Sequence, residues 1–517
     1  QERMDSGSIV NQGSIKALND YAALLAPEVR NEGLIFARQG TVALASGETI
    51  LLKFNDSKTL SSITATPSLI KGLIDNRYLI EAPGGQVIMT ATAVNILNGG
   101  IIKQSGQVNV TQAVQQSLTQ TSDGKILLSS NQIIFNSQSQ TIAHSSQGNS
   151  HISATASEHI DVKAGAIIST NATATGQNAG NIQLTAGKQL NLAGSLRANA
   201  SNSGVGGQIK TSAPTVSVAS SAQISAASNV PGQAGSWDLE ASKVNIDPIL
   251  AKVMGASLNH TNVNASANQT LCGPNCDDVG AILLESNSAI HKISLIPTSL
   301  SLRSDRNLTF NGSLQDDQGT LTASFTSFGD LSVSTLANLT SGQVSFVAAE
   351  DITIYGQVNS IGTNTQDSMV NILGANVAIY GLISGRNPLN GGKINLSALN
   401  DLILGASSRV RGYGSLISMI ANTINLTSSV IQTNNGNGRG GTIDALATAS
   451  LLVNQSSLFA NGITGGNIRL ISADANVNLS NTLVQTNGSN GRGGTIEIAG
   501  YNHTALINSS IQSNGSD

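Results

Sequence analysis

The residues of this 517-residue chain that are best suited to chemistry are few and far apart. Its only two cysteines, Cys272 and Cys276, form a C-x-x-x-C pair, which can bind a metal, act as a redox couple or close a loop through a disulfide. A four-ligand zinc site needs two further ligands, and the nearest histidines, His260 and His291, are distant in sequence. The Gly-Pro-Asn between the cysteines favours a turn over the helix start of a redox motif.

Two pairs of consecutive carboxylates, Asp277–Asp278 and Asp316–Asp317, are the best candidates for acid–base catalysis. A β-helical polysaccharide lyase or hydrolase would need such carboxylates together with tuned neighbours. Both pairs lie in polar, glycine-containing loops, and neither is followed by a His-Gly or Arg-x-Lys sequence. We therefore expect solvated loop carboxylates, no catalytic residues and no enzymatic activity.

Three histidines, His144, His151 and His159, are close together in sequence. Their spacings of seven and eight residues fit no recognised metal-ligand pattern. We expect turn or surface histidines, and we predict neither a metal site nor a cofactor.

The sequence GNGRGG at 436–441 has the G-x-G-x-x-G spacing of a dinucleotide-binding loop. A near copy, QTNGSNGRGGTIEI at 485–498, keeps the Asn/Gly/Arg character but loses that glycine spacing. The residues after the copy alternate as in a strand, whereas a nucleotide loop should open a helix. The motif is therefore interpreted as a repeated turn.

A repeat runs through much of the chain. Glycine followed by a polar residue and an aliphatic or tryptophan recurs at Gly180, Gly207 and Gly235, and again at Gly441, Gly466 and Gly494. Two rows of aliphatic residues recur with similar steps: Ile168, Leu196 and Ile224, and Ile431, Leu458, Val484 and Ile511. Such a period of 20–50 residues indicates a solenoid.

Within each repeat, short alternating segments are separated by Gly, Asn or Ser, as in NIQLTAGKQLNLAGSLRA at 181–198. Three short strands per repeat predict an all-β, right-handed parallel β-helix of about 20 coils, stacked about 4.8 Å apart. Aromatic residues are 3 % and charged residues 11 % of the chain, against about 25 % charged in ordinary domains. We expect an aliphatic lumen with little room for rings, and stacked Asn, Ser and Thr at the turns.

Charge and hydropathy argue against a nucleic-acid ligand and against a transmembrane helix. The net charge is −4, no basic run occurs and aromatic residues are scarce, so nucleic acid is not expected as a ligand. No apolar run approaches the 18 or more residues of a transmembrane helix.

The first hundred residues resemble the filamentous haemagglutinin family, the exoproteins of bacterial two-partner secretion. The resemblance rests on GSIVNQGSIKALNDYAALLAPEVRNEGLIFARQGTVALASGETILLKF at 7–54 and NRYLIEAPGGQVIMTATAVNIL at 76–97. GSWDLEASKVNID at 235–247 and TSLSLRSDRNLTFNGSL at 298–314 are similar to later family segments, although the family's Asn-Pro-Asn motifs are absent. The resemblance implies export across the outer membrane through a dedicated barrel transporter, and location in the medium or on the bacterial surface.

The resemblance also implies an adhesin: a monomeric β-helical shaft that contacts a host or bacterial receptor through exposed loops. The alternatives are the delivery stalk of a contact-dependent inhibition toxin, or another exoprotein such as a cytolysin or a haem-acquisition protein. A polysaccharide lyase or hydrolase is less favoured.

We divide the chain into the end of a secretion domain (1–110), β-helix repeats (111–245), an irregular segment with the cysteine loop (246–297) and further repeats (298–517). The sequence begins in the middle of the pattern and stops within the last repeat, so we expect a fragment of a longer protein. In an exported chain the two cysteines meet an oxidising compartment. We therefore predict a Cys272–Cys276 disulfide that shapes an exposed loop.

Overall fold

The computed structural model describes residues 7–18, 20–54, 60–67, 72–94, 100–111, 123–272, 279–364, 366–387 and 391–516. It is nearly all β, with 59 % strand and 3 % helix, and its parallel coils stack into a β-solenoid. The predicted fold class is confirmed.

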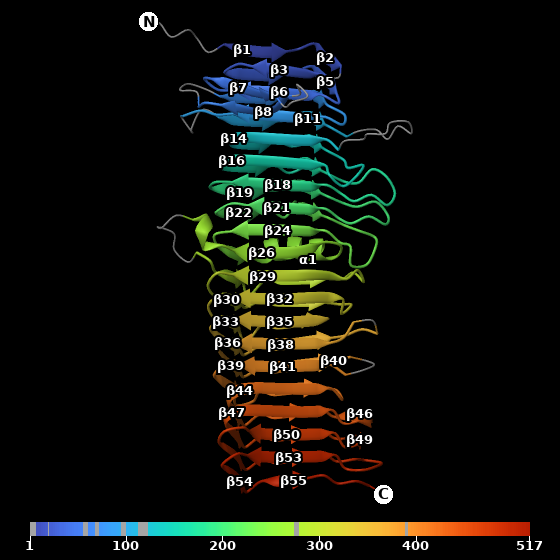
Figure 1. Cartoon of the computed structure of the whole chain (residues 1–517), viewed down its shortest axis with the longest axis vertical. Coiled ribbons are helices and arrows are strands. Elements are labelled where there is room, and N and C mark those ends of the chain that lie inside the picture. Colours follow the sequence, from blue (N-terminus) through green and yellow to red (C-terminus); the bar gives the residue numbers. More distant parts are fainter. Residues whose placement is uncertain are drawn as a thin grey trace. The chain divides into compact units, whose positions relative to one another are not determined.

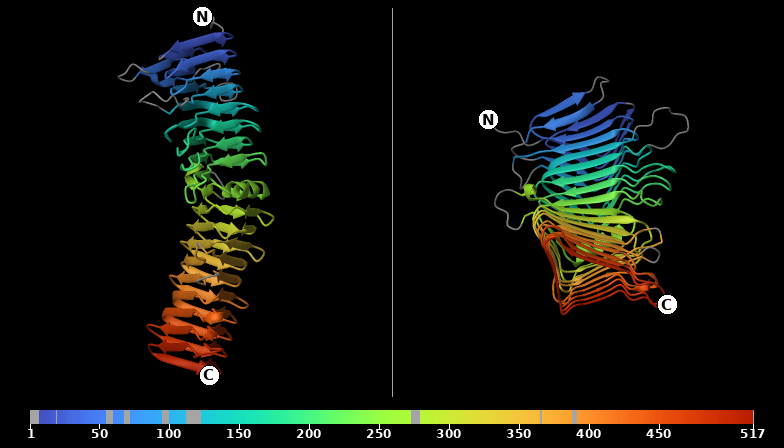
Figure 2. Two further views of the ribbon diagram at one scale, coloured as in Figure 1. Left: turned by 90° about the vertical axis from the view of Figure 1, so that its right-hand side faces the viewer. Right: turned by 60° about the horizontal axis from the view of Figure 1, so that its bottom comes forward.

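The chain divides into two compact units. Unit 1 contains Gln1–Lys243, His260–Ser266 and Thr270–Asp277, and unit 2 contains Val244–Asn259, Ala267–Gln269 and Asp278–Asp517. In both units a coil consists of a first-, a second- and a third-face strand, each paired in parallel with its counterparts in neighbouring coils. Figure 1 labels the strands in chain order, and Figure 2 turns the same ribbon.

The strands of unit 1 fall into four groups. The first-face strands are β3 (Tyr21–Leu25), β6 (Thr41–Ser46), β11 (Gln86–Ala91), β18 (Asn181–Ala186), β21 (Gln208–Ser212), β24 (Ser236–Ala241) and β26 (Asn262–Ala267). The second-face strands are β1 (Ser8–Asn11), β4 (Glu28–Asn31), β9 (Leu73–Asn76), β12 (Ile101–Gln104), β19 (Gln189–Leu192) and β22 (Thr215–Val218), while β14 (Lys125–Phe135) and β16 (His151–Val162) bend across both faces. The third-face strands are β2 (Ser14–Leu18), β5 (Leu34–Arg38), β10 (Leu79–Glu81), β13 (Gln107–Asn109), β15 (Gln140–Ile142), β17 (Ile167–Ser169), β20 (Ser195–Arg197) and β23 (Gln223–Ser225). An antiparallel hairpin, β7 (Ile50–Phe54) and β8 (Leu60–Ala65), is added to the coils.

Unit 2 repeats this plan. Its first-face strands are β29 (Thr298–Ser304), β32 (Leu321–Ser327), β35 (Gln343–Ala348), β38 (Met369–Gly374), β41 (Lys393–Ala398), β50 (Asn467–Ser472) and β53 (Thr495–Gly500), while β44 (Leu416–Thr427) and β47 (Thr442–Asn454) span two faces. Its second-face strands are β25 (Val244–Ile246), β27 (Ile282–Leu284), β30 (Leu308–Phe310), β33 (Leu331–Val333), β36 (Asp351–Ile354), β39 (Asn376–Ile379), β42 (Asp401–Leu404), β51 (Asn476–Ser480) and β54 (His503–Ile507). Its third-face strands are β28 (Ala289–Lys292), β31 (Ser313–Asp316), β34 (Asn338–Ser341), β37 (Gln357–Ile361), β40 (Leu382–Arg386), β43 (Arg409–Gly412), β45 (Val430–Gln432), β48 (Ser457–Phe459), β52 (Leu483–Gln485) and β55 (Ser510–Gln512). Two short strands, β46 (Asn435–Arg439) and β49 (Gly462–Thr464), form a small sheet of their own.

The third face has eight strands in unit 1 and ten in unit 2 among the described residues. The β-solenoid has about 16 turns, fewer than the about 20 coils expected. Additions such as the β7–β8 hairpin between β6 and β9 lengthen some coils of unit 1 beyond the regular repeat.

The register follows the aliphatic rows of the sequence. Ile168 pairs with Leu196 and Leu196 with Ile224, while Ile431, Leu458, Val484 and Ile511 pair in the same way. Strand residues alternate between the two faces of a sheet, so each row points into the lumen in every coil. Within these rows Leu196 and Leu458 are fully buried.

Aromatic rings do enter the lumen, contrary to the expectation. Phe310, Phe325 and Phe346 are buried in successive coils of unit 2, with ring centroids 5.4 and 5.1 Å apart. In unit 1, Trp237 is fully buried and its Nε1 donates to Thr211 Oγ1 at 3.0 Å. Phe325 and Phe346 pair in register and their rings stack, whereas Phe310, on a second-face strand, meets Phe325 edge-on. Such ring contacts let a narrow lumen accommodate aromatic side chains.

A buried amide ladder lies at the end of the second face in unit 1. Asn11 donates to Asn31, Asn31 to Asn76 and Asn76 to Gln104, each at 2.8 Å. Asn31 and Asn76 each both donate and accept along the ladder, so burial leaves few of their polar atoms unsatisfied. The expected stacking of polar turn residues is confirmed here.

The interval 246–297, expected to be irregular, contains one helix and several solenoid strands. α1 (Pro248–Leu258) follows β25 at the place in the coil where a third-face strand would lie, and η1 (Gln269–Leu271) follows β26. Asp247 caps the helix by accepting from Leu250 N at 2.7 Å, with Pro248 in the first turn. α1 packs on β28, and Gly255 permits close approach because a Cβ there would lie 2.7 Å from the backbone of His291.

Candidate functional site

The glycines of the repeat lie at one corner of the coil, where the third face connects to the first. We call this the glycine corner; in unit 1 it includes Gly180, Gly207 and Gly235, and in unit 2 Gly441 and Gly466. A Cβ on Gly207 or Gly466 would overlap the carbonyl oxygen of the glycine one coil earlier. The carbonyl of Gly441 also accepts the N–H of Asn467 at 2.9 Å. The backbones of the two coils can stack this closely only because glycine has no side chain.

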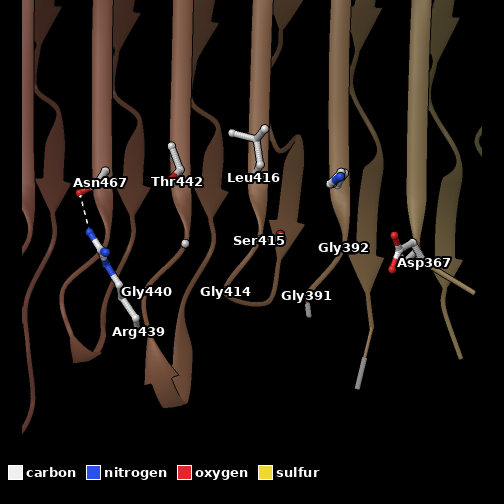
Figure 3. Close-up of a pocket in the computed structure, with 13 residues that line it drawn as sticks. Asp367, Gly391, Gly392, Gly414, Ser415, Leu416, Arg439, Gly440, Thr442 and Asn467 are labelled. Atoms are coloured by element: carbon white, nitrogen blue, oxygen red, sulfur yellow. Dashed lines mark hydrogen bonds between the residues drawn. The ribbon is translucent and has the colours of Figure 1, made fainter. Parts of the chain in front are cut away.

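A recess opens at this corner of unit 2 because one connection is short. Only residues 413–415 join β43 to β44, whereas 387–392 precede this connection by one coil and 433–441 follow it. Gly391 and Gly392 on one side and Arg439 and Gly440 on the other form the walls, and Gly414, Ser415 and Leu416 form the floor (Figure 3). The resulting recess has a volume of about 420 Å³.

The side chains around this recess are polar, with charges of both signs. Lys393, Leu416, Thr442 and Asn467 begin successive first-face strands and are paired in register. Figure 3 shows Leu416, Thr442 and Asn467 in this row. Arg439 extends along the wall and donates through Nη2 to Asn467 Oδ1 at 3.2 Å. Both basic residues are exposed, and Asp367 adds one carboxylate at the far end.

Unit 1 has a second recess at the glycine corner, of about 340 Å³. Its floor includes Gly207 and Gly235, and its walls are the connections that contain Gly148, Asn178 and Val205. These connections are held by side chain-to-backbone ladders, such as Val205 N donating to Asn178 Oδ1 at 2.9 Å. No charged side chain lines this recess, so its chemistry differs from that of the recess in unit 2.

The connection that contains Gly148 is anchored by Asp123, a residue that the sequence patterns did not single out. Its carboxylate accepts from Ser146 N and Asn149 N, both at 2.7 Å, and from Ser145 Oγ at 2.9 Å. Burial would raise the pKa of Asp123, but the hydrogen bonds from Ser146, Asn149 and Ser145 outweigh it, so the pKa lies below its usual value. The partners are more than 20 residues away in sequence, which is why no local pattern identified them.

GNGRGG lies in the long wall of the unit 2 recess. Asn435–Arg439 forms β46, and the motif's last glycine precedes strand β47 where a nucleotide loop would open a helix. The structure therefore confirms a repeated connection between strands. Its copy contributes Gly488, which is bridged to Gly462.

The carboxylates of Asp316 and Asp317, at the end of a strand, point to opposite faces of the sheet. Asp316 is buried and accepts from Leu321 N at 2.7 Å, whereas the partly exposed Asp317 lies 2.9 Å from His291 Nε2. Since consecutive strand residues point to opposite faces, these two groups cannot act on one substrate atom. The pKa of Asp317 is lowered by its hydrogen bonds with His291 and Gln315. Asp277 and Asp278 lie outside the described residues.

Asp316 is not the solvated carboxylate expected from the sequence, because it faces a fully buried lysine. Lys292 Nζ lies 3.9 Å from Asp316 Oδ1 and donates to Thr320 Oγ1 at 2.6 Å and to Ser294 O at 2.5 Å. Burial lowers the pKa of Lys292, and the carboxylate partly opposes this effect. The alternation in AIHK placed Lys292 on the same face as Ile290, which was the available signal. No recess described above reaches this pair, and we assign it to the core.

The histidines are placed separately. His144 lies on a connection, with Nε2 3.0 Å from Ser169 Oγ, while His151 and His159 lie on β16. Burial lowers the pKa of His144 and of His151, where Lys125 adds to the effect. The described part of the chain contains no group of three His, Cys, Asp or Glu residues arranged to hold a metal.

The cysteine loop is only partly described. Cys272 follows η1, whereas Cys276 lies outside the described residues. The Cys272–Cys276 disulfide stays a prediction. Among the described helices, none has the length and apolar character needed to cross a bilayer.

Comparison with known proteins gives no further assignment. No protein-family model matches the chain, and no curated protein sequence matches it significantly.

Proposed function

We propose that this chain is part of a bacterial adhesin-type exoprotein, exported by two-partner secretion and displayed on the cell surface or released. The proposal rests on the resemblance of residues 7–54 and 76–97 to filamentous haemagglutinin proteins, together with the β-solenoid fold. On this proposal the partners are an outer-membrane barrel transporter and a receptor on a host or bacterial surface.

One observation favours surface contact over catalysis. In both units the interior of the coils is filled by buried side chains, while the two recesses described above lie outside, at the glycine corner. The floor of each is rigid stacked backbone, and the walls are connections of variable length. Such a design can change its contact surface through the connections without disturbing the core, which is the usual division of labour between loops and scaffold.

Export also fits the physics of the repeat. Each coil is stabilised mainly by the coil before it, so the fold can form progressively as a chain emerges from a narrow channel. A delivery stalk for a C-terminal toxin has the same requirement and is the second candidate. The gene sequence beyond Asp517 separates the two, since a nuclease-like or pore-forming globular region would favour the stalk.

We expect the fluorescently labelled chain to bind saturably to bacterial or epithelial cells. Excess unlabelled chain should compete for this binding. Incubation with polygalacturonate should release no new reducing ends. Absence of saturable binding to every surface would contradict the adhesin, and release of products would favour a polysaccharide-degrading enzyme.

A further inference from the structure

The recess of unit 2 combines two unpaired basic groups with a row of hydrogen-bonding groups. Lys393 and Arg439 are both exposed, and within the described ranges neither forms an ion pair. By contrast Arg469, on the neighbouring first-face strand β50, is neutralised by Asp444, with Arg469 Nη2 2.8 Å from Asp444 Oδ2. The positive charge at the recess is therefore left available for a ligand.

The positions of the two basic groups set the size of a ligand. Lys393 begins β41, and Arg439 precedes β47 and reaches toward Asn467 on β50. Two to three coils separate them, which is roughly 10 to 14 Å at about 4.8 Å per coil. A single small anion cannot reach both groups, but an extended molecule with two negative charges can.

The lining between the two basic groups favours a polyhydroxylated molecule. Thr442 and Asn467 offer a hydroxyl and an amide, and Asp367 accepts hydrogen bonds at the end beyond Lys393. Among the described residues of this lining, Leu416 is the one large apolar side chain. Gly391, Gly392 and Gly414 contribute backbone to the recess (Figure 3), and neighbouring residues occupy the space where their side chains would lie.

We propose that this recess binds a short stretch of a carboxylated polysaccharide, with one carboxylate at Lys393 and another at Arg439. Arginine pairs with carboxylates through parallel hydrogen bonds, while lysine acts as a point charge. Sugar hydroxyls would then bond to Thr442, Asn467 and Asp367. The inference rests on the proposed surface-contact function and deepens it by naming the chemistry of one ligand.

The test uses trigalacturonate and isothermal titration calorimetry on the full 517-residue chain. Lys393→Gln and Arg439→Gln should each weaken binding roughly tenfold, as expected for loss of one charge-assisted contact. Leu416→Trp should block binding by filling the recess without changing charge. Arg306→Gln is the matched control, since Arg306 is an exposed basic residue at another corner of unit 2 and should leave binding unchanged.

Two further probes separate the chemistry of the ligand. Methyl-esterified trigalacturonate, which is neutral, should bind at least tenfold more weakly, and the affinity of trigalacturonate should fall with salt. Equal binding of pentaglutamate would overturn the polysaccharide assignment in favour of an acidic peptide. No binding of trigalacturonate, or equal effects of Arg306→Gln and Arg439→Gln, would overturn the proposal itself. Saturable cell binding that survives Lys393→Gln and Arg439→Gln would reject this recess while leaving the adhesin proposal intact.

Discussion

Replacing Gly441 by alanine places a methyl group where the carbonyl oxygen of Ser415 lies in the previous coil. The new methyl group, which is fixed to the backbone of residue 441, would clash with the backbone of Ser415. Thr433 Oγ1 also lies inside contact distance of the methyl group. The coils must separate locally, which lengthens the hydrogen bond from Thr442 N to Ser415 O, now 2.8 Å. Overpacking of this kind costs about 1–3 kcal/mol, and a clash with backbone should lie at or above the upper end.

The same motif provides its own control. No atom lies within 4 Å of the position that a Cβ on Gly436 would occupy, and the φ of Gly436 is not in the left-handed region. Gly436→Ala should therefore be neutral or stabilise by up to about 1 kcal/mol through the unfolded chain. If GNGRGG were a nucleotide loop, its first glycine would matter as much as its last.

Hydrogen exchange measured by mass spectrometry on β44, β47 and β50 is the appropriate assay, because unfolding of a long repeat array is not a single two-state transition. A cost of about 3 kcal/mol corresponds to a loss of protection of roughly two orders of magnitude in Gly441→Ala. Equal protection in the Gly441 and Gly436 variants would refute the account of the glycine corner.

Three further predictions concern buried polar groups. Asn31→Ala should cost about 2 kcal/mol, because it removes the acceptor of Asn11 Nδ2 and the donor to Asn76 Oδ1 within the buried ladder, and exchange in β1 and β9 should report it. Lys292→Met should cost about 3–5 kcal/mol by leaving Asp316 as an unpaired buried charge, and adding Asp316→Asn should recover part of the loss of protection in β28 and β31. The pKa of Asp123 is lowered on folding, so its stabilisation of residues 145–149 is complete above about pH 4 and disappears as pH falls through the folded pKa. Exchange in that connection should therefore rise as the pH falls below about 4, after correction for intrinsic rates, and Asp123→Asn should raise it already at about pH 7.

The rows of aliphatic residues made the architecture predictable. A row such as Ile431 and Leu458 repeats at the coil length, and only stacking of parallel strands places such residues in register. The glycines of the repeat also recur at the coil length, and they therefore indicated the glycine corner correctly. The helix α1 was missed because Pro248–Leu258 is apolar on most sides and has no clear helical stripe, although Asp247 and Pro248 form a recognisable start.

The recess of unit 2 could not be predicted, because it depends on lengths of neighbouring connections rather than on a motif. Residues 413–415 contain no recognisable motif. They form the floor of the recess only because longer connections lie one coil away on both sides. The buried pairing of Lys292 with Asp316 likewise joins residues on different strands. Local sequence showed which residues face inward but not which residues meet.

Site-specific photocrosslinking tests most directly whether the glycine corner is the contact surface. p-Benzoylphenylalanine would replace Asn437, an exposed residue of β46 at that corner of unit 2, or Arg306 at another corner of the same unit, and each labelled chain would be irradiated on cells that bind it. The account predicts crosslinks to a surface component from position 437 and few from position 306. Crosslinks mainly from position 306, or equal crosslinking from both, would contradict it.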